Sequence, residues 1–363
     1  MGIDIKFTEE DWERVSNDWS AWWAGELDRP MVVVESANML ITAMGRMTQD
    51  FLMDSPVDDV IDFFQGKLEN IEYHGDAWPK WFPNFGPGAV AGFLGSNVAF
   101  RPEQQTVWYD TDDIEPIEKL GFHFDPENKL WNRVKALTSA AVERWGDNVS
   151  VGHTDLGGNL DILSSFRTAN RLLVELIDAP EEVIRLSVEI TEAWLRYYDE
   201  LYSIIEPLGR GTSGWAEIWS PNGRTYMTQS DFCYMISPQM FERFVMPDLS
   251  ACFEKLDHSF YHLDGKGEIV HLDHLLSMEN LDGIQWIPGA GQPQPEEWMP
   301  LLKRIRDGGK LCQVYVTARG ARKIVREIGG GGFVLYVIPF PVMSAEEASD
   351  FLKVLADEDI SRK

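Results

Sequence analysis

The chain has 363 residues, a mass of 41.4 kDa and a net charge of −27, with a sequence pI near 4.6. Such an acidic chain repels nucleic-acid phosphates and anionic lipids, so roles on those partners are not expected. The three cysteines are widely spaced and form no C-x-x-C pair. No apolar run reaches the length of about 20 residues that a membrane span needs. The acidic Asp4 lies where a signal peptide has basic residues. We therefore expect a cytoplasmic protein with free thiols.

The N-terminal region predicts a helix followed by a strand. Thr8 and the two glutamates after it suit a helix start, and tryptophans recur at helical spacing over residues 8–27. The Arg29-Pro30 pair ends this helix before the apolar run 31–34, which we interpret as the first strand. A second helical pattern covers residues 56–74.

Short apolar runs bounded by turn residues recur along the rest of the chain, and with the first strand they make eight. They are 31–34, 81–83, 149–153, 214–219, 259–264, 283–287, 311–316 and 333–337. Amphipathic helices are predicted between most of these runs, notably over 180–205, 238–257, 295–307 and 318–328. Eight short strands that alternate with helices are typical of an α/β (β/α)8 TIM barrel.

The domain organisation follows from this pattern. We expect one barrel domain over residues 1–363, with an N-terminal helical extension at residues 1–30. The interval 86–148 is long and rich in glycine, proline, aspartate and aromatic residues. We interpret it as an inserted excursion over the mouth of the barrel.

Functional groups of such barrels lie at the C-terminal ends of the strands, where the predicted strand 259–264 carries His262 and Asp264. These two residues are two positions apart, so they lie on the same side of the strand. Glu217 lies between two tryptophans, and a carboxylate at that depth either binds a metal or forms a salt bridge, for example with Arg167. A histidine with two carboxylates suits Zn²⁺ or another divalent metal, so we predict Glu217, His262 and Asp264 as ligands; ordinary hydrogen-bonded core residues are the alternative.

Other polar and aromatic residues at predicted strand ends are candidates for catalysis or substrate binding. Asp231 can hydrogen-bond a ligand or only order its own loop, and Asp155 can alternatively cap a helix beside a tight turn. The catalytic candidates are Glu217, Asp231 and His262. The substrate-binding candidates are Asn38, Asn84, His153, Asp155, Trp215, Trp286 and Tyr336.

The segment 232–241, with Pro247 after it, and the strand 261–265 resemble the uroporphyrinogen decarboxylase superfamily. The resemblance is strongest from about Val149 to the C-terminus. This superfamily contains heme-pathway decarboxylases and zinc-dependent methyltransferases that exchange methyl groups with corrinoid proteins or coenzyme M. The resemblance therefore implies a barrel enzyme.

Two departures from the family pattern narrow the expected activity. The decarboxylases carry an Arg-Gln-Ala-Gly-Arg signature after the first strand, whereas this chain has Glu-Ser-Ala-Asn there, at residues 35–38, and no arginine between that strand and Arg46. The methyltransferases use a His-x-Cys pair and a late cysteine to hold zinc. Here His262 matches the histidine, Asp264 replaces the cysteine, and the stretch after Val337 offers no late cysteine. The resemblance therefore implies a harder, oxygen-rich metal site that polarises the leaving group.

The expected function is transfer of a methyl group from a small O- or N-methylated compound to a corrinoid carried by a partner protein. Zn²⁺ or another divalent metal is the expected cofactor, and a homodimer fits the superfamily. Two alternatives stay open. One is a metal-free lyase or decarboxylase that acts on a small carboxylated or aromatic substrate by general acid–base chemistry. The other is a non-catalytic ligand-binding barrel.

Overall fold

The computed structural model describes residues 3–36, 49–101, 106–112, 114–207, 209–338 and 343–362. Its central element is a seven-stranded sheet with the order β2-β1-β13-β12-β11-β10-β9, in which every neighbouring pair is parallel except the antiparallel β2-β1 pair. The strands are β1 (Met31–Ser36), β2 (Glu72–Gly75), β9 (Thr225–Gln229), β10 (His258–Asp264), β11 (Gly283–Ile287), β12 (Leu311–Val316) and β13 (Phe333–Val337). The fold is therefore α/β with a parallel sheet.

Three further strand pairs accompany this sheet. β3 (Lys80–Trp81) and β6 (Ser150–Val151) are parallel, whereas β7 (Thr212–Ser213) and β8 (Trp219–Ser220) are antiparallel. β7 contacts both β6 and β9, and the backbone N–H of His153 donates to the carbonyl of Ser213 at 2.9 Å. The antiparallel pair of β4 (Asn97–Arg101) and β5 (Thr106–Asp110) lies within the interval 86–148.

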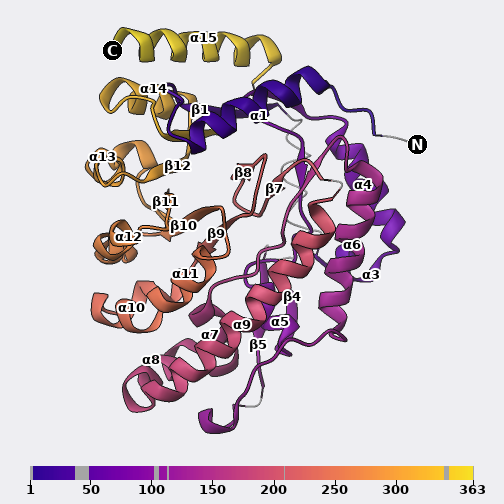
Figure 1. Ribbon diagram of the computed structural model, residues 1–363, viewed down its shortest axis with the longest axis vertical. Helices are drawn as coiled ribbons and strands as arrows, with labels where there is room; N and C mark the ends of the chain where they lie inside the picture. The colour runs from indigo at the N-terminus through magenta and orange to yellow at the C-terminus, as the bar shows by residue number, and fades with distance from the viewer. Residues whose placement is uncertain are drawn as a thin grey trace.

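Helices lie outside the strands, and α10 to α15 follow one another along one side of the molecule (Figure 1). The helices are α1 (Glu9–Trp23), α3 (Gln49–Asp54), α4 (Val57–Leu68), α5 (Ala89–Phe93), α6 (Lys129–Trp145), α7 (Asn159–Arg167), α8 (Ala169–Asp178), α9 (Pro180–Ile205), α10 (Pro238–Phe244), α11 (Met246–Phe253), α12 (Leu272–Ser277), α13 (Met299–Asp307), α14 (Ala318–Glu327) and α15 (Ala345–Arg362). Short 3-10 helices are η3 (Ile117–Lys119), η4 (Asp231–Met235), η5 (Glu268–His271) and η6 (Pro295–Glu297). Among the described residues, no helix combines the length and apolar character needed to cross a membrane.

The two faces of the sheet belong to two different apolar clusters. Because side chains alternate along a strand, Val33 and Phe260 face a small tryptophan-rich cluster, whereas Val34 and Tyr261 face the larger core under the helices. Helix α1 supplies much of the small cluster through its buried face. The small cluster comprises Phe7, Trp12, Val15, Trp19, Trp22, Met31, Val33, Ala77, Trp78, Ala216, Ile218, Trp219, Met227, Phe260 and Val334.

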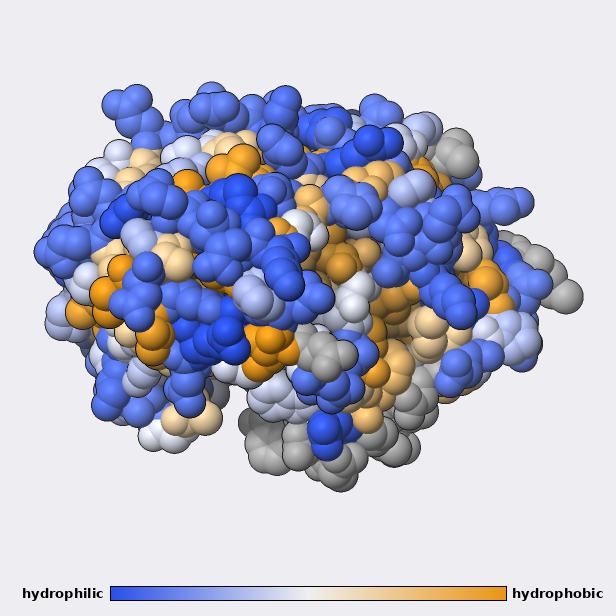
Figure 2. Space-filling view, turned by 90° about the horizontal axis from the view of Figure 1, so that it is seen from below, coloured by the Kyte–Doolittle hydropathy of each residue, from blue (hydrophilic) through white to orange (hydrophobic). Residues whose placement is uncertain are grey.

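The outer surface agrees with the acidic composition. Figure 2 shows a face that is mostly hydrophilic, with apolar side chains exposed in patches between charged ones. With a net charge of −27, such a surface keeps molecules apart in solution.

Several predicted elements differ from the structure. Residues 214–219 do not form one strand, because β7 ends at Ser213 and only Trp219 belongs to β8. The predicted helix 238–257 is divided into α10 and α11 at Val245, since Pro247 has no N–H for the hydrogen bond that a continuous helix requires. The strand β9 was not predicted, and neither was α15. The predicted helix 180–205 is confirmed as α9.

Candidate functional site

A row of four polar side chains crosses the sheet on the face that carries the tryptophan-rich cluster. Gln229, His262, Gln285 and Gln313 are register partners on the neighbouring parallel strands β9, β10, β11 and β12. Phe260 and Met227 lie two residues earlier on the same face. The face therefore changes from apolar to polar toward the C-terminal ends of the strands, where the site of a barrel-like α/β fold is expected.

Hydrogen bonds along this row fix the tautomer of His262. The Nε2 amide of Gln313 donates to the carbonyls of Ala216 at 3.0 Å and Glu217 at 3.2 Å, which can only accept. Gln313 Oε1 must then accept from Gln285 Nε2, at 2.7 Å, and Gln285 Oε1 accepts from Nδ1 of His262. The Nδ1 of His262 is consequently protonated, and its Nε2 presents a lone pair.

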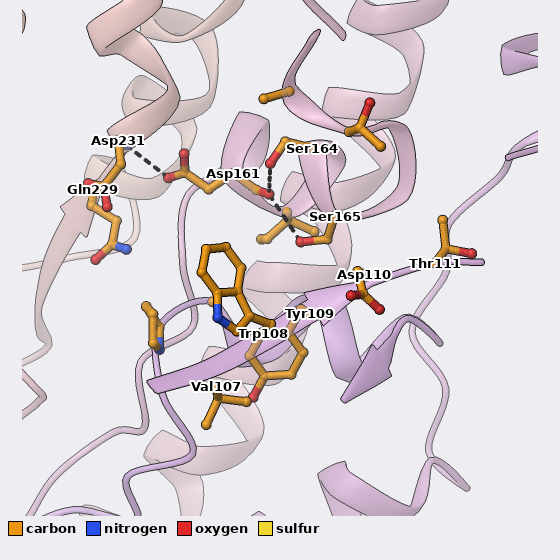
Figure 3. Close-up of a pocket in the computed structure, with 15 residues that line it drawn as sticks. Val107, Trp108, Tyr109, Asp110, Thr111, Asp161, Ser164, Ser165, Gln229 and Asp231 are labelled. Atoms are coloured by element: carbon orange, nitrogen blue, oxygen red, sulfur yellow. Dashed lines mark hydrogen bonds between the residues drawn. The ribbon is translucent and has the colours of Figure 1, made fainter. Parts of the chain in front are cut away.

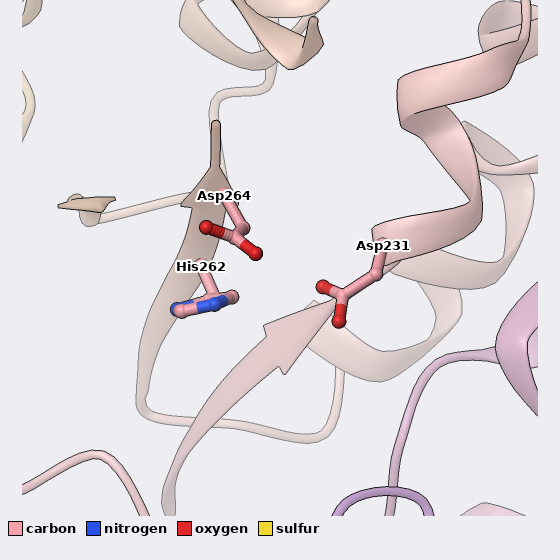
Figure 4. Close-up of side chains that lie close together, drawn as sticks. All are labelled: Asp231, His262 and Asp264. Atoms are coloured by element: carbon pink, nitrogen blue, oxygen red, sulfur yellow. The ribbon is translucent and has the colours of Figure 1, made fainter. Parts of the chain in front are cut away.

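His262 belongs to a cluster of three potential metal ligands. One ligand atom from each of Asp231, His262 and Asp264 lies within 4.8 Å of the other two. Figure 4 shows His262 and Asp264 extending from the end of β10 toward Asp231, which follows β9. Strand alternation places the first two side chains together, and the parallel pairing of β9 with β10 brings the third.

The electrostatic surroundings of this cluster are acidic. Burial raises the pKa of Asp231 above its usual value; His262 opposes this shift, and Asp264 adds to it. Burial also raises the pKa of Glu268 well above the usual range, and repulsion from Asp231 contributes. The Oδ1 atom of Asp264 is buried and accepts no hydrogen bond within the described part of the chain. A cation placed among these carboxylates would relieve their mutual repulsion.

Glu217 takes a different place from the one predicted. Its carboxylate accepts a hydrogen bond from the Tyr315 hydroxyl at 2.7 Å, and burial raises its pKa. The third acid beside His262 and Asp264 is Asp231 instead. The backbone of Glu217 has a φ of 54°, in the left-handed region that non-glycine residues rarely adopt. Gln313 holds this strained residue through its carbonyl, so the polar row and the Glu217 loop are directly connected.

Tyr336 and Trp215 contact different groups of this polar region. The Tyr336 hydroxyl donates to Glu35 at 3.0 Å, and Glu35 also pairs with Lys80. The ring of Trp215 meets the ring of His262 edge to face, with centroids 5.1 Å apart. Trp215 thus contacts the metal-competent cluster, whereas Tyr336 contacts the Glu35–Lys80 ion pair.

The other predicted substrate-binding residues lie deeper or make structural contacts. His153 is fully buried and stacks on Tyr198 at 4.3 Å, and burial lowers its pKa to about 4. Trp286 is also fully buried. The side chain of Asn84 accepts from the backbone of Gly86 at 3.0 Å in a local turn. Asn38 lies outside the described residues.

Asp155 is buried close to the turn at Gly157. Its carboxylate accepts from the backbone of Gly157 at 3.0 Å and Gly88 at 3.4 Å. Burial raises the pKa of Asp155 to about 7, and repulsion from Asp231 contributes. With this pKa, Asp155 titrates near neutrality while it holds the backbone of Gly88.

A cavity of about 440 Å³ adjoins the metal-competent cluster and shares Asp231 with it. Its walls come from β5, α7 and the end of β9 (Figure 3). The lining residues are Pro87, Gly88, Val107, Trp108, Tyr109, Asp110, Thr111, Asp161, Ile162, Ser164, Ser165, Thr168, Ala169, Gln229 and Asp231. The inserted interval 86–148 thus contributes a wall of this cavity.

Sequence reasoning did not single out Gln229, Gln313 or Asp161. A signal was present for Gln313, because glutamine interrupts the two apolar runs 283–287 and 311–316, and an amide on a buried strand face needs a polar partner. Asp161 accepts from the backbone N–H of Asp231 at 3.1 Å and of Phe232 at 2.7 Å. This contact bridges segments 70 residues apart, so no local pattern reveals it.

Comparisons with known proteins find similarity in structure only. No family model and no curated protein matches this sequence. A solved methyltransferase from Methanosarcina mazei matches with a TM-score of 0.61 and 12% identity, over 95% of this chain and 98% of that chain. A B12-independent methionine synthase from Shewanella sp. W3-18-1 has a TM-score of 0.35 and 12% identity, over 74% and 75% of the two chains, which is too distant to support an inference. The chain therefore shares the overall fold of the Methanosarcina methyltransferase.

Proposed function

We propose that this protein is a metal-assisted methyltransferase. It would move a methyl group from a small O- or N-methylated donor to a corrinoid carried by a partner protein. The observation that carries this proposal is the Asp231–His262–Asp264 cluster, which lies after β9 and at the C-terminal end of β10. The fold shared with a solved methyltransferase supports the same reaction class.

The residues of the cluster fit a divalent metal. Two carboxylates and a neutral imidazole are typical ligands of Zn²⁺ and of harder divalent ions, and three protein ligands leave a position open. The hydrogen bond from His262 Nδ1 to Gln285 resembles the support that metal-bound histidines usually receive. Bonds of about 2.1 Å hold ligand atoms about 3.4 Å apart in a tetrahedral centre, so side-chain rotation has to close the 4.8 Å cluster by at most about 1.4 Å.

The residues around the cluster have distinct roles in the proposed reaction. The chemistry that a bound ion supplies is Lewis-acid polarisation of the oxygen or nitrogen that carries the methyl group. Gln285 holds His262 in the required tautomer, and Trp215 covers one edge of its ring. Asp161 holds the backbone of Asp231 and so positions its carboxylate.

Metal analysis and a methyl-transfer assay test this proposal together. Purified protein is reconstituted with zinc, cobalt, iron or manganese and mixed with a cobalt(I) corrinoid protein and a panel of methoxylated and methylamine donors. We expect metal-dependent formation of the methylated corrinoid, seen in its absorbance. His262→Ala should abolish turnover while the melting temperature changes by only a few degrees. Less than about a tenth of an equivalent of metal after reconstitution would refute the metal centre.

A further inference from the structure

The cavity beside the metal-competent cluster has the size of a small-molecule site. Its volume of about 440 Å³ falls within the range of about 300–1,000 Å³ typical of ligand pockets. Trp108 is 53% exposed, and Figure 3 shows its indole extending from β5 toward Asp161. An aromatic face of this size at a cavity wall can cover an apolar group or a cation.

The polar atoms of the lining are mostly hydrogen-bond acceptors. The hydroxyls of Ser164 and Ser165 donate to the backbone carbonyl of Asp161, at 2.8 and 3.3 Å, which leaves their oxygen lone pairs to accept. Gln229 is 5% exposed, and its Oε1 atom accepts no hydrogen bond within the described part of the chain. A buried amide oxygen without a partner is costly, so a ligand that donates a hydrogen bond to it would be stabilised.

The charged side chains that line the cavity are all acidic. Asp110, Asp161 and Asp231 line the cavity, and no lysine or arginine is found among its described lining residues. A positive ligand would offset the repulsion among these carboxylates, whereas an anion would increase it.

We propose that this cavity binds a small organic cation, namely an amine or a quaternary ammonium compound with an apolar body. The inference rests on the proposed function, because the cation would be the methyl donor, with its positive nitrogen in the cavity and a methyl-bearing oxygen or unprotonated nitrogen at the metal. The acceptor-rich wall and the aspartates recognise the positive head, while Trp108 and the apolar lining residues cover the rest. This choice narrows the donor from O- or N-methylated compounds in general to cationic ones, and it disfavours carboxylated substrates.

Binding of two isosteric probes to the metal-loaded, full-length protein tests this inference by calorimetry. Choline carries a quaternary nitrogen, and 3,3-dimethylbutan-1-ol has a neutral carbon at the same position. We expect choline to bind at least about tenfold more tightly, since one attractive charge contact at this depth contributes that much. Asp161→Asn should reduce choline affinity about tenfold and leave the affinity for the neutral alcohol unchanged.

Three further variants guard against indirect effects. Asp110→Asn removes a lining charge without touching the backbone of Asp231, and it should also weaken choline binding. Trp108→Leu should weaken it by a factor of about two to five through loss of the cation–π contact. Glu254→Gln alters an exposed acid at the end of α11 and should change nothing. Equal affinity for the two probes, no measurable choline binding, or unchanged binding in both aspartate variants would overturn the inference.

The inference and the proposed function can fail separately. Selective binding of choline without methyl transfer from any cationic donor would support the cation site and contradict the methyltransferase. Methyl transfer from neutral methoxylated donors alone, with no preference between the probes, would contradict the cation site and support the methyltransferase.

Discussion

Gln285 donates a 2.7 Å hydrogen bond to Gln313 between the neighbouring strands β11 and β12, and both side chains are fully buried. Gln313 Nε2 donates to two backbone carbonyls, so Gln313 Oε1 is the atom that accepts from Gln285. Gln285 Oε1 in turn accepts from Nδ1 of His262. The backbone of the Glu217 loop thereby determines which nitrogen of His262 is available to a metal. Residues outside the cluster thus set the tautomer of His262, which is the one imidazole in the Asp231–His262–Asp264 cluster.

The first prediction concerns this positioning role. Gln285→Leu removes the acceptor for His262 Nδ1, so the affinity for zinc or cobalt should fall about 10- to 100-fold. Gln285→Glu keeps an acceptor at that position and should restore most of the affinity. Metal titration by calorimetry measures both. Gln239→Leu, on the exposed surface of α10, is the control; a Gln285→Leu protein with wild-type affinity would show that the row is only structural.

The second prediction concerns the pH dependence of metal binding. Because the pKa of Asp231 is raised by burial and by Asp264, this carboxylate takes up a proton at a higher pH than an ordinary aspartate. A metal must displace that proton, so the apparent affinity should fall about tenfold for each unit below the raised pKa. Titrations from pH 8 down to pH 4 should show the affinity beginning to fall while the pH is still above the ordinary aspartate value of 3.8, with proton release on binding. An affinity independent of pH over this range would contradict it.

The third prediction concerns stability and Asp155. Its pKa of about 7 in the folded protein exceeds the ordinary value of 3.8, so the folded state keeps a proton that the unfolded chain releases between these pH values. The stabilisation is fully present below pH 3.8 and is lost as pH rises toward 7, by at most about 4 kcal/mol. Asp155→Asn should remove this loss, because an amide does not ionise. Urea unfolding at pH 5 and pH 7.5 measures it, and parallel pH profiles for the two proteins would refute the assignment.

The fourth prediction concerns the tryptophan-rich cluster. Trp19 is fully buried, and its indole N–H donates to the carbonyl of Asp76 at 3.1 Å. Trp19→Ala should lower the free energy of unfolding by about 3–5 kcal/mol, through lost burial and an unfilled cavity. Ile177→Ala removes a side chain that is 68% exposed and should cost less than about 0.5 kcal/mol. Similar losses in the two variants would mean that α1 does not anchor this end of the sheet.

Local patterns predicted much of the fold, because helix starts, prolines and apolar runs act over a few residues. The pattern at 180–205 gave the full length of α9. The alternation of side chains along one strand likewise predicted that His262 and Asp264 lie on the same side of β10. The partner Asp231 and the displacement of Glu217 could not be predicted, because they depend on the register between β9 and β10 and on the turn after β7. β9 was missed because Thr225 and Gln229 make its run too polar to be recognised as a buried strand.

Anomalous diffraction at the absorption edge of the bound metal tests the central claim most directly. Crystals of protein reconstituted with zinc or cobalt should show one strong anomalous peak within bonding distance of Asp231, His262 and Asp264, and this peak should disappear in His262→Ala. A peak located at Glu217, or no peak at this cluster in protein that contains a full equivalent of metal, would contradict the account.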